Sequence, residues 1–175
     1  IEKLNACTQV GYRLITIFED EYVYRKGQTM ARLDRILGVA AVKKLHESSC
    51  QAKAVDAVTA SKFLSEHLLS GVPPCGQHYG LYLADTLLSC ITISKGKNVL
   101  GEHTLAMYGQ NHFIDITGGL NRLIKLAKDD LNIRRVMGYV DRRWFTGNYY
   151  LQNGFHYVGA SAPNCWKLDG RRRIE

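Results

Sequence analysis

Two strand-like runs at residues 79–84 and 87–94 are separated by only Asp85-Thr86, and this spacing predicts a β-hairpin. Residues 103–109 have the composition of a third strand. A hairpin with a neighbouring strand buries one face only if helices or a second sheet cover it. The middle of the chain therefore restricts the protein to folds that contain a sheet.

Helical patterns alternate with these strands along the chain. Helices are expected after the N-cap residue Thr59, after Gly118-Gly119 at residues 120–130, and at residues 145–152. Further extended segments are expected at residues 44–55, 134–140, 155–158 and 165–168. From residue 44 the order is strand, helix, three strands, helix, strand, helix and two strands, which predicts an α/β (α+β) fold with a mixed central sheet flanked by helices.

The first 38 residues have a different pattern. Residues 2–9 favour a short helix, residues 12–18 form a β-rich run typical of a buried strand, and residues 29–37 favour a second helix that ends at Gly38. Three elements are too few to close a core. We therefore expect a helix-strand-helix appendage at residues 1–38 and one domain at residues 44–175.

Composition narrows the class of protein. Apolar residues make up 46% of the 175 residues, enough for a core, and no apolar run has the roughly 18–20 residues of a membrane span. Five widely spread cysteines form no C-x-x-C pair, which favours reduced thiols and a cytoplasmic location. The net charge of +7 favours a polyanionic partner, although a solvated basic face has the same composition.

The tract at residues 81–93, the later Gly118-Gly119, and Tyr150 with Gly154-Phe155 together resemble the GNAT acyltransferase fold. This resemblance implies a β-bulged central strand before a helix whose first amides hold the pyrophosphate of acetyl-CoA or another acyl-CoA. The implied donor-binding residues are Gly118, Gly119, Leu120, Asn121 and Arg122. The family has a small residue where Leu120 stands, and a glycine pair is also an ordinary strand-to-helix turn.

A closer resemblance is to the C-terminal region of phage homing-endonuclease-like proteins, in which a nuclease domain of the very-short-patch-repair type precedes a GNAT-like domain. It rests on the tracts at residues 11–21, 141–148 and 163–171, and the same region is distantly similar to the DNA-modification protein of phage Mu. It implies that residues 1–38 are a remnant of the nuclease domain. Nuclease activity is not expected from these residues alone.

The catalytic candidates are Tyr150 and Asp141. A phenol at Tyr150 would protonate the leaving thiolate, as the resemblance implies, and the alternative is a core tyrosine. Asp141 follows a strand, where it would orient an amine acceptor or act as a base. An ion pair of Asp141 with Arg142 or Arg143 is the equal alternative.

Nucleic-acid contacts are expected from guanidinium groups that pair with phosphate and from an indole that stacks on a base. The candidates are Arg142, Arg143, Trp144, Asn148, Arg171 and Arg172. The run at residues 171–173 also fits a solvated tail. No metal is expected, because the six histidines lack ligand spacing and Glu19-Asp20-Glu21 fits a solvated cap.

Three functions are consistent with these residues. The first is a phage DNA-acting protein that binds DNA and transfers an acyl group from acyl-CoA to an amine on nucleic acid, which makes the chain an N-acyltransferase. The second is a catalytically silent DNA-targeting module of the endonuclease, and the third is a small-molecule N-acetyltransferase. DNA is the expected partner, no membrane is expected, a homodimer through residues 1–38 is a further expectation, and the location would be the cytoplasm of a bacterial host.

Overall fold

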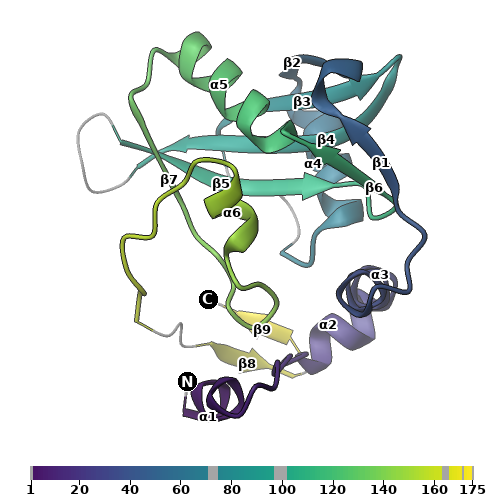
Figure 1. Ribbon diagram of the computed structural model, residues 1–175, viewed down its shortest axis with the longest axis vertical. Helices are drawn as coiled ribbons and strands as arrows, with labels where there is room; N and C mark the ends of the chain where they lie inside the picture. The colour runs from purple at the N-terminus through teal and green to yellow at the C-terminus, as the bar shows by residue number, and fades with distance from the viewer. Residues whose placement is uncertain (1, 71–74, 97–101, 163–165, 171, 175) are drawn as a thin grey trace. The chain divides into compact units, whose positions relative to one another are not determined.

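The computed structural model describes residues 2–70, 75–96, 102–162, 166–170 and 172–174, and Figure 1 shows its helices and strands. These residues form two compact units. The first unit contains the described residues up to Lys26 together with those from Val140 onward, and the second runs from Gly27 to Tyr139. The sequence predicted a different division, into a nuclease remnant at residues 1–38 and a GNAT-like domain at residues 44–175. That division rests on family resemblance and stays a prediction.

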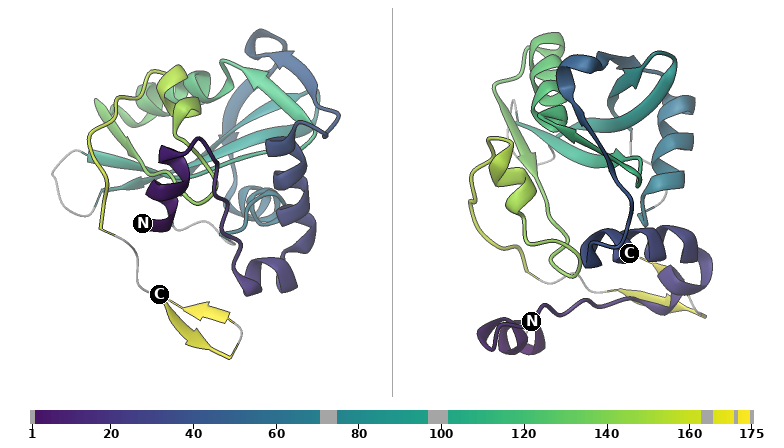
Figure 2. Two further views of the ribbon diagram at one scale, coloured as in Figure 1. Left: turned by 60° about the horizontal axis from the view of Figure 1, so that its bottom comes forward. Right: turned by 45° about the vertical axis from the view of Figure 1, so that its right-hand side comes forward.

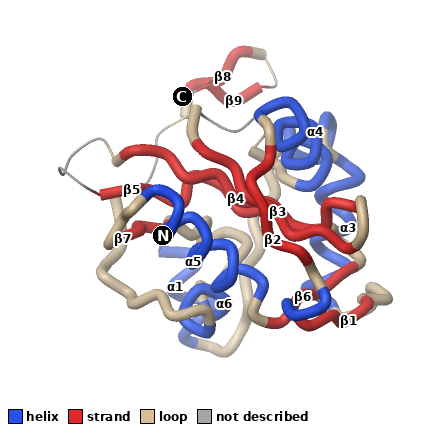
Figure 3. The backbone as a smooth tube through the Cα atoms, turned by 90° about the horizontal axis from the view of Figure 1, so that it is seen from above, coloured by secondary structure: helices blue, strands red, loops and turns tan. Residues whose placement is uncertain are grey.

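A five-stranded sheet in the order β2-β3-β4-β5-β7 forms the centre of the second unit (Figure 3). Its strands are β2 (Gln51–Val55), β3 (Gln77–Leu83), β4 (Thr86–Lys95), β5 (Glu102–Gln110) and β7 (Arg135–Gly138). Neighbours are antiparallel from β2 to β5, and β5 and β7 are parallel. The predicted hairpin and the predicted mixed sheet are confirmed.

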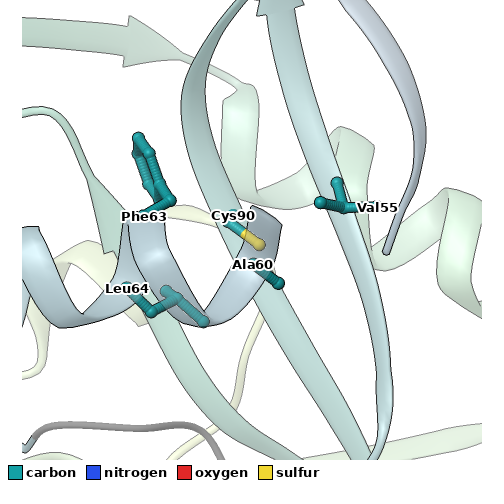
Figure 4. Packing of buried hydrophobic residues seen from close by; sticks show 5 residues of the cluster. All are labelled: Val55, Ala60, Phe63, Leu64 and Cys90. Atoms are coloured by element: carbon teal, nitrogen blue, oxygen red, sulfur yellow. The ribbon is translucent and has the colours of Figure 1, made fainter. Parts of the chain in front are cut away.

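Helices cover both faces of this sheet, as Figures 1 and 2 show for α4 (Ala57–His67) and α5 (Gly119–Leu131). Phe63 and Leu64 of α4 pack against Cys90 of β4 and Val55 of β2 (Figure 4). The thiol of Cys90 is fully buried, and burial raises its pKa to about 12. This cysteine therefore packs in the core and is a poor nucleophile.

The start of α4 differs from the expectation that Thr59 is its N-cap. Asp56 is the N-cap, and its carboxylate accepts hydrogen bonds from the N–H groups of Val58 at 3.0 Å and Thr59 at 2.9 Å. A side-chain oxygen at the N-cap bonds the amides two and three residues later, and Asp56 stands at that distance from Thr59.

A second, two-stranded sheet joins β1 (Lys43–His46) to β6 (Ile114–Thr117) in parallel. The short 3₁₀ helix η1 (Glu47–Ser49) follows β1, so the predicted extended segment at residues 44–55 is interrupted once. Strand β6 was not expected from the sequence, because it has four residues and its partner lies about 70 positions upstream.

The first unit contains the helices α1 (Glu2–Gln9), α2 (Glu19–Tyr24) and α6 (Asn148–Gln152) and the antiparallel pair β8 (Lys167–Asp169) and β9 (Arg172–Ile174). Helix α3 (Lys26–Leu37) begins at Lys26, which belongs to the first unit, and its other residues belong to the second unit. Among the described side chains of the first unit, Glu21 and Trp144 are the ones that are buried.

Two predicted strands are wrong. Residues 12–18 and 155–158 pair with no strand in the described part of the chain. Their β-branched and aromatic composition favours an extended backbone, but a ladder also needs a partner strand, and composition does not supply one. Helix α2, which starts with three acidic residues, and strand β9, in the predicted tail, were not expected.

None of the described helices combines the length and the apolar character needed to cross a lipid bilayer.

Candidate functional site

The two glycines at the start of α5 are both required by the local structure. Gly118 is the N-cap and has φ +77°, in the left-handed region that favours glycine. Gly119 is buried, and a Cβ atom there would lie 3.0 Å from Leu81 Cδ1 and 3.1 Å from two atoms of Ile116. The pair therefore forms a close strand-to-helix turn, the alternative that the sequence left open beside a phosphate site.

The other predicted donor-binding residues lie in the first turn of α5. Leu120 is fully buried in the core, and Asn121 is exposed. The guanidinium of Arg122 donates to the backbone carbonyl of Glu47, so this group fastens η1 to α5. The structure brings the predicted residues together at the N-terminus of one helix.

Strand β5 contains a β-bulge. Thr92 and Ile93 of β4 are consecutive, yet they pair with Met107 and Leu105 of β5, so Ala106 is an extra residue in β5. A bulge of this kind bends the strand that carries it. Pairing of β5 with β7 ends at Leu105, directly before the bulge, and the edge of β5 beyond it has no strand partner among the described residues.

Tyr150 lies in α6 of the first unit. Its ring packs edge to face on Phe155 with centroids 5.1 Å apart, and the N–H of Phe155 donates to the carbonyl of Tyr150 at 3.1 Å. Gly154 has φ +81°, so the Tyr-x-x-x-Gly-Phe pattern forms the end of a helix. Burial raises the pKa of Tyr150 to about 12, which keeps its proton in place at neutral pH but makes it a weak acid.

Asp141 is held by Arg143. The carboxylate accepts from the backbone N–H of Arg143 at 3.0 Å, from Nε at 3.2 Å and from Nη2 at 2.6 Å. The sequence left two equal interpretations of Asp141, a functional carboxylate and an ion pair with a neighbouring arginine. The structure contains the ion pair.

Glu21 connects this pair to both ends of the chain. Its side chain is only 3% exposed, and its carboxylate accepts from Arg143 at 2.9 and 3.1 Å and from Arg173 at 3.0 Å. The prediction that Glu19-Asp20-Glu21 forms a solvated cap is wrong for Glu21. A buried carboxylate persists when it is paired with charged donors, and here two arginines supply them.

Arg173 also contacts Asp20 and Phe18 of this unit. Its Nε lies 2.9 Å from both carboxylate oxygens of Asp20, and its guanidinium stacks on Phe18 at 3.9 Å from the ring centroid. Arg143 also stacks on Phe18, at 4.2 Å. Burial alone would raise the pKa of Asp20, but the hydrogen bonds and charge of Arg173 lower it below its ordinary value.

We call Asp20, Glu21, Asp141, Arg143 and Arg173 the carboxylate–arginine cluster. For Arg143, burial would lower the pKa, and the bonds to Glu21 and Asp141 raise it on balance. The sequence missed this cluster, since its members come from three distant segments. The only available signal was an unusual density of acids at residues 19–21 and of arginines at residues 171–173.

The remaining predicted nucleic-acid residues differ in exposure. Arg142 and Asn148 are exposed, whereas Trp144 is 1% exposed and its indole is not a surface on which a base can stack. Strand β9 contains Arg172, and Arg171 lies outside the described residues. Among the candidates whose side chains the structure describes, Arg142 and Asn148 are therefore the ones exposed to solvent.

Two histidines of the second unit meet at the end of α4. The rings of His67 and His112 are 5.1 Å apart, and His67 Nδ1 and His112 Nε2 are buried and make no hydrogen bond to a described residue. Burial lowers the pKa of both; for His112, the charges of His67, Arg32 and Arg35 add to this and the value falls to about 4. Among the described residues, no three His, Cys, Asp or Glu side chains gather as a metal site.

Comparisons with protein families, with curated proteins and with solved structures found no match to this chain.

Proposed function

We propose that this chain is a phage DNA-acting protein whose GNAT-like domain binds an acyl-CoA donor and transfers the acyl group to an amine on nucleic acid. The observation that carries the proposal is the glycine pair at the start of α5, where Gly118 has φ +77° and Gly119 leaves no room for a Cβ atom, together with the bulge at Ala106 of the earlier strand β5. A bulged strand followed by a helix that opens with Gly118-Gly119 is the arrangement that the family resemblance implies.

The edge of β5 and the N-terminus of α5 offer groups that can bind the amides and the diphosphate of acyl-CoA. The unpaired edge of β5 offers backbone N–H and C=O groups, and the arm of acyl-CoA carries two amides that can bond to such an edge as an added strand does. The N-terminus of α5 offers amides and the positive end of a helix dipole to the diphosphate. The family resemblance implies Tyr150, in the first unit, as the acid for the departing thiolate.

Titration of acetyl-CoA by calorimetry tests the donor site. An Asn121→Asp variant adds one negative charge at an exposed position in the first turn of α5, and should weaken binding at least fivefold while it keeps the fold. The matched control is Lys125→Gln, which makes the same change in charge at an exposed position one turn later. If millimolar acetyl-CoA does not bind the unmodified chain, the acyltransferase proposal is wrong.

A catalytically silent DNA-targeting module is the second candidate, and the carboxylate–arginine cluster favours it. Asp141, the carboxylate proposed to orient the amine acceptor, accepts three hydrogen bonds from Arg143. Burial raises the pKa of Tyr150 to about 12. Both groups are thus suited to holding the first unit together. DNA binding without acetyl-CoA binding would support this candidate over the first.

A further inference from the structure

His67 and His112 come from separate segments of the second unit, and their rings lie side by side. His67 is the last residue of α4, and His112 lies in the turn between β5 and β6. The ring centroids are 5.1 Å apart and the ring planes are inclined at 77°. Because the two positions are 45 residues apart, spacing along the chain gave no sign of the pair.

Each ring has a buried nitrogen that no described residue bonds. These atoms are Nδ1 of His67 and Nε2 of His112. Buried side-chain nitrogens are normally hydrogen-bonded, so two such atoms on neighbouring rings require an explanation. A single ion between the rings would satisfy both, because an unprotonated imidazole nitrogen offers the lone pair that a transition metal accepts.

The separation of the rings fits a tetrahedral ion. With metal–nitrogen bonds of about 2.0–2.1 Å, two imidazoles on one tetrahedral zinc ion have centroids about 5 Å apart, and a linear arrangement would place them about 6 Å apart or more. The observed 5.1 Å matches the tetrahedral value. Zinc is the metal that takes imidazole ligands in this geometry most readily.

Contacts to protein groups hold both rings in place. The ring of His67 packs edge to face on Phe63, with centroids 4.4 Å apart. Arg35 fixes the turn that carries His112, since its guanidinium donates to the carbonyls of His112 at 3.2 Å and Ile114 at 2.9 Å. Ligands that are already positioned lose less conformational entropy when an ion binds.

The charges around the pair set the strength expected of the site. Arg32 and Arg35 of α3 lie close enough to His112 to repel a cation. Glu66 lies close enough to His67 to attract one, and the C-terminus of α4 adds the negative end of a helix dipole. These opposing charges, and the lack of a third protein ligand among the described residues, favour micromolar rather than nanomolar affinity.

We propose that His67 and His112 form a zinc site, with Nδ1 of His67 and Nε2 of His112 as its two protein ligands and water at the remaining positions. The site is independent of the proposed acyl-CoA site and of DNA binding. A bound ion joins the end of α4 to the turn between β5 and β6, so zinc should stabilise the second unit.

Isothermal titration of zinc chloride into the full chain at pH 7.5 tests the site, after alkylation of accessible cysteines, because thiolates also bind zinc. We expect one ion to bind per chain with micromolar affinity. His67→Phe and His112→Phe keep an aromatic ring and remove a ligand, so each should weaken binding at least tenfold. His156→Phe, the same change at an exposed histidine of the first unit, is the matched control and should bind zinc as wild type does.

Nitrogen-15 NMR of the imidazoles identifies the ligands in the wild-type chain, so the test does not depend on the folding of the variants. Zinc should shift Nδ1 of His67 and Nε2 of His112 and leave the ring nitrogens of His156 unchanged. If circular dichroism shows that a variant is unfolded, this result decides. The proposal is overturned if submillimolar zinc does not bind, if the shifts are confined to other histidines, or if folded His112→Phe binds zinc as tightly as wild type does.

Discussion

Glu21 and Arg143 form a two-point ion pair between positions 122 residues apart, with Nη2 and Oε1 at 2.9 Å and Nη1 and Oε2 at 3.1 Å. Glu21 is 3% exposed in its side chain and Arg143 26% exposed, so the pair lies largely out of water. Two parallel N–H···O bonds fix both distance and orientation. This pair, together with Arg173, joins the N-terminal, middle and C-terminal segments of the first unit.

Glu21→Gln should destabilise the first unit by about 3 kcal/mol, because it removes the buried charge that two partly buried guanidiniums share. Urea denaturation followed by circular dichroism would measure the loss. Glu2→Gln, the same change at an exposed position of α1, should alter the free energy of unfolding by less than about 0.5 kcal/mol. Equal stabilities of the two variants would show that the cluster contributes little.

Arg142→Ala and Arg143→Ala should have different effects on DNA binding. Arg142 is exposed, so its removal should lower the slope of log affinity against log salt by about 1 and leave stability unchanged. Arg143→Ala should instead lower the urea midpoint, since Glu21 and Asp141 lose the guanidinium that bonds to both of them. Fluorescence anisotropy with a labelled duplex measures the slope. A slope that Arg142→Ala leaves unaltered contradicts the assignment of this residue to the DNA surface.

Gly119→Ala should cost about 1–3 kcal/mol in stability, because the added methyl group would lie 3.0–3.1 Å from Leu81 and Ile116 in a filled core. Gly27→Ala is the control: it lies in α3, has nothing within 4 Å of the new Cβ atom, and should be neutral or stabilising by about 0.5 kcal/mol. Thermal melts of both variants give the comparison. A wild-type melting temperature for Gly119→Ala would mean that the turn has room for a side chain.

The histidine pair should make stability depend on pH in the acid range. The pKa of His112 falls from an ordinary 6.5 to about 4 on folding, so between these values the unfolded chain binds more protons. The folded state is therefore fully stable above pH 6.5 and loses on the order of 2 kcal/mol as the pH falls towards 4.

His112→Phe keeps an aromatic ring against His67 and removes the titrating group. Its urea midpoint should fall less than that of wild type between pH 7 and pH 4.5. Parallel curves for the two proteins would show that His112 does not titrate in this range.

The elements whose cause is local could be predicted from residue patterns along the chain. The hairpin of β3 and β4 follows from two β-rich runs around a two-residue turn, and α5 follows from apolar residues at helical spacing after a glycine pair. The residues proposed for the donor site are neighbours along the chain, so their common position at the start of α5 was also predictable.

The contacts between residues that are distant in the sequence could not be predicted in this way. Glu47 faces Gly118 because β1 pairs with a strand about 70 residues downstream, and Glu21 is buried because arginines 122 and 152 positions away reach its carboxylate. Such pairings depend on register and on burial, which act between segments rather than within them. For the same reason the strand predicted at residues 12–18 failed: its composition favours an extended backbone, and a ladder requires a second strand that composition does not name.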